Sequence, residues 1–420
     1  MERASNKGPT ADWSGRQVRF MTAGSVDDGK STLIGRLLLD SHTLMRDQSE
    51  SLQCTDELLD LAALTDGLEA EQAQGITIDV AYRYFATDRA SFIIADAPGH
   101  VQFTRNMVTA ASVSDVVVIV IDAAGVTSGR LKPQTQRHAA VAALMGLDVI
   151  VAVNKMDLVA WSQERFDAVC GAFALVAESL SLRNVNYVPV SARKGDNVVH
   201  RGGADWYAGE TLVSLLESAS LARDFASAPL RLPVQVVLRD GNRRLYAGRI
   251  ASGGLRPGDR VRVGPSGQPA VVAQVLINGV GAPVAYSGAS VSVELVEDRD
   301  LSRGSVITQA GAAYTRRIIA DVCWLDEQAF VPGRRYRLRQ GALETAAMIE
   351  RVLFERDIDS LGEKPADGLS LNGIARVVVA TRDPILADLY ADLPGTGAFA
   401  MFDPDTNQTA AAGMIREPLA

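Results

Sequence analysis

The first half of the chain alternates two hydrophobic patterns. Mostly apolar runs predict short strands covered on both faces, at residues 18–23, 91–95, 149–153 and 187–190. Apolar positions spaced three and four residues apart predict helices, at residues 31–39, 164–182 and 211–218. Strands that alternate with helices are typical of an α/β domain. We therefore predict one such domain over residues 17–228, after a flexible segment at 1–16.

Beyond residue 228 the helical pattern gives way to short strands separated by glycine and proline. The strand patterns lie at residues 232–237, 244–250, 260–263 and 289–295. A second run of this kind begins near Thr315 and continues to the C-terminus. The pattern predicts all-β structure, as in small closed barrels, which we divide into residues 229–312 and 313–420.

Residues 24–31 carry the most specific chemical signal. They fit the phosphate-binding pattern of two glycines separated by four residues and followed by lysine and a hydroxyl residue, and they lie between a predicted strand and a predicted helix. The backbone N–H groups of such a loop surround phosphates, the lysine reaches the outer phosphates and the hydroxyl binds Mg²⁺. The predicted triphosphate site consists of Gly24, Ser25, Val26, Asp27, Asp28, Gly29, Lys30, Ser31 and Thr32.

The predicted strand at residues 91–95 leads into a carboxylate that is soon followed by glycine and histidine. Asp96 stands where an aspartate directed at Mg²⁺ is expected. Gly99 can donate its N–H to a γ-phosphate, and His100 is placed to orient the attacking water. His100 could instead be a structural side chain, but its position favours the catalytic interpretation. The nucleotide contacts expected here are Asp96, Ala97, Pro98, Gly99 and His100.

The predicted strand at residues 149–153 delivers four residues that identify the base. The carboxylate of Asp157 can accept the N1 proton and the exocyclic amino group of guanine, a pairing that adenine does not offer. Asn154 and the stem of Lys155 would hold the ring. The predicted base site consists of Asn154, Lys155, Met156 and Asp157, with a small loop at Ser191, Ala192 and Arg193 that can meet the guanine carbonyl.

A mobile threonine that closes on Mg²⁺ and the γ-phosphate is the remaining part of a GTPase switch. Thr77, in the segment 75–78, lies between the phosphate loop and Asp96 and supplies it. The predicted catalytic residues are therefore Lys30, Thr77, Gly99 and His100, and the predicted metal ligands are Ser31, Thr77 and Asp96.

With these motifs the chain resembles the translational GTPases, the family of elongation factor Tu. The segments 24–38, 64–71 and 74–85 sharpen this, because together they look like the GTPase subunits of bacterial sulfate adenylyltransferases. Elongation factors do not carry the long string that follows the phosphate loop, at residues 64–71 and 74–85. The resemblance runs from about Gln17 to Ile415.

The resemblance implies a P-loop GTPase domain followed by two β-barrels, with GTP and Mg²⁺ as ligands. It also implies a partner, a small catalytic subunit that makes adenylyl sulfate and pyrophosphate from ATP and sulfate while this chain hydrolyses GTP. The alternative is an elongation-factor-like protein that binds an RNA or the ribosome. The acidic composition and residues 79–85 favour the first function, and a tRNA or ribosome binding assay discriminates between them.

The chain departs from the usual pattern of this family at two places. Gln72 and Ala73 replace part of a charged run before the switch threonine, and Leu393 and Pro394 replace an asparagine–arginine pair. We expect these changes to bear on switch closure and on a partner surface rather than on the nucleotide motifs. Residues 123–133 form a longer loop than the shortest family members have, and we predict that it is a solvated surface loop.

Composition narrows the remaining function classes. No apolar run reaches membrane length in the 420 residues, and the N-terminus lacks a secretory core, so we expect a cytoplasmic protein. The three cysteines, Cys54, Cys170 and Cys323, are too scattered for a disulfide framework or a metal cluster. A net charge of −8 argues against general nucleic-acid binding.

Overall fold

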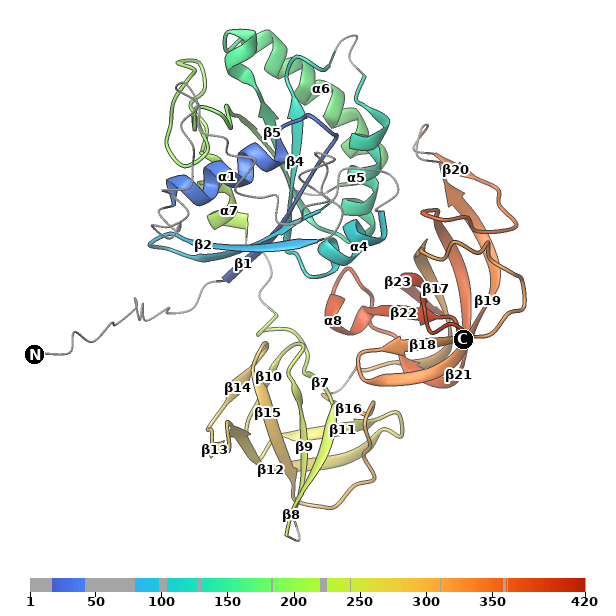
Figure 1. The fold of residues 1–420 in the computed structure, drawn as a ribbon. Coiled ribbons are helices and arrows are strands. Elements are labelled where there is room, and N and C mark those ends of the chain that lie inside the picture. The colour runs from blue at the N-terminus through green and yellow to red at the C-terminus, as the bar shows by residue number, and fades with distance from the viewer. Residues whose placement is uncertain are drawn as a thin grey trace, which may run out of the picture. The chain divides into compact units, whose positions relative to one another are not determined.

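The computed structural model divides the chain into two compact units, Met1–Ala222 and Arg223–Ala420, which are described separately (Figure 1). The structure describes residues 17–41, 80–97, 104–126, 130–182, 184–219, 225–241, 243–309, 311–357, 360 and 362–419. The predicted flexible segment 1–16, the segment 64–73, Thr77 and the run 98–100 lie outside these residues.

The first unit is an α/β domain built on a six-stranded sheet in the order β2-β3-β1-β4-β5-β6 (Figure 1). All neighbours in this sheet pair in parallel except the edge strand β2, which runs antiparallel to β3. Its elements are β1 (Gln17–Gly24), α1 (Lys30–Asp40), β2 (Ala81–Ala86), β3 (Ser91–Asp96), α4 (Thr104–Ser112), β4 (Val116–Asp122), α5 (Pro133–Leu144), β5 (Asp148–Asn154), the 3-10 turn η2 (Met156–Val159), α6 (Gln163–Ser179), β6 (Val185–Pro189) and α7 (Leu212–Ala219).

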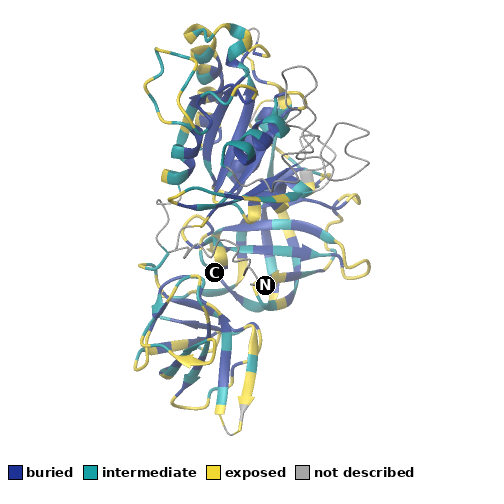
Figure 2. Cartoon of the chain, turned by 60° about the vertical axis from the view of Figure 1, so that its left-hand side comes forward, coloured by how far each residue is buried: buried dark blue, intermediate teal, exposed yellow. Residues whose placement is uncertain are grey.

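Helices cover both faces of this sheet. Leu33 and Leu37 of α1 and Leu216 of α7 pack in one apolar cluster with Phe20 of β1, and α5 contacts β1 and β4. The central strands are therefore buried along nearly their whole length, as the dark blue strands of Figure 2 show. Continuous apolar runs belong to strands of this kind, which is why the sequence pattern predicts them correctly. Among the described residues, no helix has both the length and the apolar character needed to cross a bilayer.

The second unit begins with a β-barrel around one apolar cluster that contains Tyr246, Val263 and Val293. Its main sheet has the order β7-β16-β11-β12-β15-β9-β8. The predicted single strand 232–237 is wrong, because Val234 leaves the ladder to exchange hydrogen bonds with Gly304 and Ser305, which splits the run into β7 and β8. The strands are β7 (Arg231–Pro233), β8 (Val236–Asp240), β9 (Arg243–Arg249), β10 (Gly254–Leu255), β11 (Arg260–Gly264), β12 (Gln268–Ile277), β13 (Val280–Gly281), β14 (Ala285–Tyr286), β15 (Ser290–Leu295) and β16 (Val306–Thr308).

A second antiparallel barrel follows, with the sheet order β18-β22-β23-β17-β21-β19-β20 and an additional pairing of β18 with β19. Trp324 lies in its core, edge-on to Phe330 and Tyr336. Leu393 is buried, and Pro394 starts the short helix α8. The elements are β17 (Tyr314–Trp324), β18 (Tyr336–Gln340), β19 (Leu343–Arg356), β20 (Glu363–Lys364), β21 (Ile374–Leu386), α8 (Pro394–Gly397), β22 (Ala398–Phe402) and β23 (Thr409–Leu419).

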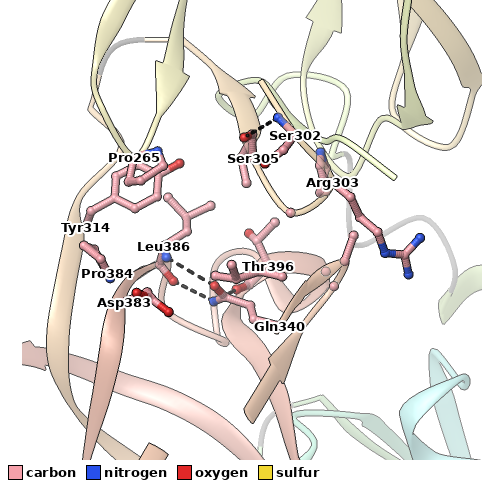
Figure 3. A pocket seen from close by; sticks show the side chains of 17 residues that line it. Pro265, Ser302, Arg303, Ser305, Tyr314, Gln340, Asp383, Pro384, Leu386 and Thr396 are labelled. Atoms are coloured by element: carbon pink, nitrogen blue, oxygen red, sulfur yellow. Dashed lines mark hydrogen bonds between the residues drawn. The ribbon is translucent and has the colours of Figure 1, made fainter. Parts of the chain in front are cut away.

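One buried ion pair joins the two barrels, and further polar groups of the second barrel bond next to it. The guanidinium of Arg231, on β7, donates two hydrogen bonds of 2.8 Å to the carboxylate of Asp388, which also accepts from the Thr396 hydroxyl. The Gln340 amide donates to the carbonyls of Leu386 and Thr396 and accepts the N–H of Leu386 (Figure 3). We call Arg231, Gln340, Asp388 and Thr396 the barrel seam.

A small cavity of about 130 Å³ lies beside the barrel seam (Figure 3). Pro265 and Arg303 line it from the first barrel, and Asp383 and Pro384 line it from the second. The buried hydroxyl of Tyr314 has no hydrogen-bond partner in the described part of the chain, and burial raises the pKa of Tyr314 to about 12. The tyrosine therefore stays neutral and adds no charge to the seam.

Candidate nucleotide-binding site

Four strands of the first unit end at the same edge of the sheet. β1, β3, β4 and β5 end at Gly24, Asp96, Asp122 and Asn154. In the register of the sheet, Thr22 lies beside Asp96 and Asp122 lies beside Asn154. Ligands of open α/β sheets bind outside this carboxyl edge, so the predicted phosphate and base motifs meet where a nucleotide would bind.

Two glycines shape the loop between β1 and α1. A Cβ atom on Gly24 would lie 2.7 Å from the backbone oxygen of Val120, on the neighbouring strand. Gly29 caps α1 with φ +94°, and a Cβ there would lie 2.3 Å from the amide nitrogen of Asn154. Only glycine fits at either position without a shift of the surroundings, so the loop keeps its open backbone.

The ammonium group of Lys30 is buried inside this loop. Its Nζ donates to the carbonyls of Gly24 at 2.9 Å and Ser25 at 3.2 Å. Burial lowers the pKa of Lys30, and the carboxylates of Asp96 and Asp28 oppose that shift. A buried cation whose hydrogen bonds go only to neutral carbonyls favours the arrival of an anion.

The two predicted metal ligands that the structure describes are Asp96 and Ser31. The Thr22 hydroxyl donates to the Asp96 carboxylate at 3.0 Å and so fixes its orientation at the end of β3. Ser31 stands in the first turn of α1, half-buried, and its hydroxyl has no partner in the described part of the chain. The third predicted ligand, Thr77, lies outside the described residues.

Asp28 ties the phosphate loop together from inside. Its carboxylate is buried, and Oδ2 accepts the N–H of Ser25 at 2.9 Å. Its backbone oxygen accepts the amide of Asn154 at 2.9 Å. The buried hydroxyl of Ser25 has no hydrogen-bond partner among the residues that the structure describes, so one polar atom of the loop is available to a ligand.

The loop after β4 agrees only in part with the surface loop predicted at residues 123–133. In its described residues, Ala124, Gly125, Arg130, Lys132 and Pro133 are exposed, whereas Ala123, Val126 and Leu131 are buried. The ammonium of Lys132 bonds to Asp28 at 2.7 Å. The pattern of glycine and charged residues gave no sign of this, because a contact between residues 104 positions apart leaves no local signal.

Asn154 connects the phosphate loop to the base loop. Its amide nitrogen bonds to Asp28, and its Oδ1 accepts the N–H of Ala192 at 3.0 Å. The Nε of Arg36, on α1, donates to the carbonyl of Ala192 at 3.2 Å, and the same guanidinium contacts the carbonyl of Arg193. The sequence did not predict either the link that Asn154 makes between the two loops or the contacts of Arg36 with the base loop.

The two remaining base-site side chains differ in how they are bonded. Lys155 pairs with Asp122 at 2.8 Å, which holds the lysine stem along the site. Asp157, in η2, is half-buried, and its carboxylate makes no hydrogen bond or ion pair with any residue that the structure describes. A free carboxylate next to a fixed lysine stem fits the guanine edge described above.

His138 is a further buried group near this site that sequence reasoning missed. It lies on α5, fully buried, with Nε2 3.1 Å from the Gln134 amide nitrogen, and Nδ1 has no partner in the structure. Burial, together with Lys30 and Arg137, lowers the pKa of His138 to about 3. The ring is therefore neutral at physiological pH.

The site as a whole fits a nucleoside triphosphate with Mg²⁺. A glycine-shaped loop and a buried lysine lie along one edge of the sheet, with a Ser25 hydroxyl and an Asp157 carboxylate that bond to none of the described residues. Ser31 and Asp96 supply oxygen atoms, the ligands that Mg²⁺ prefers.

Comparison with known proteins gives two family matches and many relatives. Residues 15–227 match the elongation factor Tu GTP binding domain, and residues 317–416 match a GTP-eEF1A C-terminal domain-like family. The sulfate adenylyltransferase subunit 1 of Aeromonas salmonicida is 44% identical over 415 residues, which cover 96% of this chain and 87% of that protein. The bifunctional enzyme CysN/CysC of Mycobacterium tuberculosis is 45% identical over 416 residues, which cover 95% of this chain and 67% of that protein.

Proposed function

The chain belongs to the sulfate adenylyltransferase subunit 1 family, and from this we propose that it is the GTP-hydrolysing subunit of a sulfate-activating enzyme. The observation that carries the proposal is the 44% identity over 96% of the chain, which includes both barrels as well as the nucleotide site. A protein that shared only the GTPase machinery would resemble this family over the first unit alone.

In this proposal, GTP hydrolysis drives a separate, smaller catalytic subunit to form adenylyl sulfate and pyrophosphate from ATP and sulfate. The sulfate–phosphate anhydride is high in energy. A switch whose GTP-bound state favours the partner's reaction can draw on GTP cleavage, because two reactions that bias one conformational equilibrium influence each other.

The residues of this chain divide the work at the nucleotide. Lys30 and the backbone N–H groups at the start of α1 hold the phosphates. Asp157 selects guanine, and Asn154 keeps the base loop and the phosphate loop in register. Thr77, Gly99 and His100 are proposed to act only when a γ-phosphate is present.

Ser31, Asp96 and Thr77 are proposed to hold Mg²⁺. The ion, when bound, neutralises charge on the β- and γ-phosphates as the terminal phosphate leaves. The Thr22 hydroxyl donates to the Asp96 carboxylate at the end of β3 and so helps to hold this proposed ligand in place.

In the decisive experiment, the chain is purified with and without the catalytic subunit. GTP hydrolysis and adenylyl sulfate formation are then measured in the same samples. Lys30→Ala is expected to lower hydrolysis by roughly a hundredfold or more and to remove the GTP-stimulated part of adenylyl sulfate formation. The same complex without GTP sets the unstimulated rate. If Lys30→Ala abolished hydrolysis and left the stimulated rate intact, coupling through this site would be disproved.

His100→Ala separates turnover from binding. It is expected to bind GTP with Mg²⁺ and to hydrolyse it roughly two decades more slowly, because the proposed role of His100 is to orient water. Wild-type turnover would remove His100 from the mechanism. If no sulfate-activating partner bound and aminoacyl-tRNA did, the function of a translation factor would replace this proposal.

A further inference from the structure

The phosphate loop contains a buried carboxylate, Asp28, whose negative charge would oppose the binding of a polyphosphate unless a cation neutralised it. The side chain of Asp28 is 1% exposed, and it lies close enough to Lys30 to influence its pKa. A buried negative charge repels an arriving polyanion and is costly to bury without a partner. The chain nevertheless uses this residue as a structural link, through Ser25 and Asn154.

Lys132 resolves this conflict. Its Nζ lies 2.7 Å from Oδ1 of Asp28, opposite the oxygen that accepts the Ser25 N–H. The lysine side chain is 44% exposed, so it reaches from the surface onto a buried acid. It stands at the start of α5, in the loop after β4, and comes from no nucleotide motif.

We propose that Lys132 is a positioning residue for nucleotide binding, which neutralises Asp28 and holds its carboxylate against the N–H of Ser25. The inference rests on the proposed GTP-binding function. It adds Lys132, at the N-terminus of α5, to the site, as a residue that sets how well the phosphate loop binds a nucleotide.

Action through Asp28 has two measurable consequences. The phosphate loop holds GDP and GTP alike, so loss of Lys132 should weaken both to the same extent, unlike the loss of a switch residue. The effect should also disappear when Asp28 carries no charge. A lysine that attracted the phosphates directly would act equally well in both backgrounds.

The test is a double-mutant cycle of Lys132→Met and Asp28→Asn, with dissociation constants for mant-GDP and mant-GTP measured in Mg²⁺ buffer. Asparagine retains an oxygen that can accept the N–H of Ser25. Lys132→Met is expected to weaken both nucleotides roughly tenfold in the wild-type background and less than about twofold in the Asp28→Asn background. Lys132→Arg should restore affinity to within roughly threefold of wild type.

Lys364→Met is the matched control. Lys364 is 47% exposed and lies 3.5 Å from Glu355 and 3.9 Å from Asp357 in the second barrel, so the substitution removes the same charge from a similarly exposed lysine outside the first unit. It should leave both dissociation constants unchanged. Circular dichroism of each variant checks that the fold is retained, and Lys132→Gln replaces Lys132→Met if the latter unfolds.

The outcomes separate the two hypotheses. If wild type bound neither mant-GDP nor mant-GTP, the proposed function itself would fail. If wild type bound both and Lys132→Met matched it, or weakened binding equally in both Asp28 backgrounds, the positioning role would be wrong while the GTP site stood.

Discussion

The nucleotide site and the barrel seam both bury polar groups, but they differ in how completely those groups are bonded. At the seam, the guanidinium of Arg231 donates hydrogen bonds to Asp388 and to the backbone carbonyl of Leu230. The side chain of Gln340 makes three hydrogen bonds. At the nucleotide site, the Ser25 hydroxyl and the Asp157 carboxylate have no partner in the described part of the chain.

The difference separates two uses of buried polarity. At the seam, the Arg231–Asp388 pair holds the two barrels together, and the polar atoms of Arg231 and Gln340 have partners within the protein. At the nucleotide site, the Ser25 hydroxyl and the Asp157 carboxylate remain available to a ligand. Each prediction below tests one side of this comparison.

The largest effect is expected at the seam. Arg231→Met leaves the Asp388 carboxylate buried without its cation, which should destabilise the second unit by about 3–5 kcal/mol. Urea unfolding followed by tryptophan fluorescence measures this, in a background where Trp13, Trp161 and Trp206 are replaced by phenylalanine so that Trp324 alone reports. The double variant Arg231→Met/Asp388→Leu removes both charges and should recover much of the loss. If the double variant were no more stable than the single one, the pairing argument would not hold.

Asp157 tests the open side. Asp157→Asn should weaken GTP binding roughly a hundredfold and improve xanthosine triphosphate binding, because an amide can donate to the xanthine carbonyl where the carboxylate accepted from guanine. The unfolding free energy should not change, since this carboxylate bonds to no described residue. Competition binding of the two triphosphates measures the switch, and unaltered GTP affinity would exclude Asp157 from the base site.

His138 provides a pH test of incomplete pairing. Its pKa is about 3 in the folded chain and near 6.5 in the unfolded chain. Between these pH values His138 is protonated only in the unfolded state, so lowering the pH below 6.5 favours unfolding. The free energy of unfolding of the first unit should therefore fall by about 2 kcal/mol between pH 7 and pH 5. The His138→Leu variant should not show this decrease. Urea unfolding at both pH values gives the difference. Parallel losses in the two proteins would show that His138 is not the group responsible.

Thr22 should give the smallest effect. Thr22→Val removes the hydrogen bond to Asp96 and leaves the volume of the side chain nearly unchanged, at a cost of about 1 kcal/mol. If Asp96 serves the metal, the Mg²⁺ concentration needed for half-maximal GTP hydrolysis should rise roughly fivefold, while Thr22→Ser stays near wild type. An unchanged Mg²⁺ requirement would make the hydrogen bond purely structural.

The sequence predicted the fold class well because its signals are local. The runs that became β1 and β5 are apolar throughout and end in polar motifs, and the structure confirms the α/β domain followed by barrels. Contiguous segments of sequence likewise predicted membership of the sulfate adenylyltransferase subunit 1 family, and the comparisons confirm it. The roles of Thr77, Gly99 and His100 stay predictions.

What the sequence did not predict depends on long-range contacts. Arg231 and Asp388 lie 157 positions apart, and Lys132 and Asp28 lie 104 apart, so no local pattern joins them. His138 lies on the buried side of α5, and a single histidine next to alanines does not predict which residues will surround it in the fold. Such pairings are visible only once the chain is folded.

The buried pair at the seam also sets how this protein can be divided for study. Arg231 and Asp388 come from different barrels, so a fragment that ends after the first barrel, or begins with the second, would carry one buried charge to its cut surface. The fragment 223–420, which is the second compact unit, keeps the pair intact. Deletion analysis of partner binding should therefore remove the two barrels together, because loss of binding by a single barrel would report damage to the fragment as readily as a lost interface.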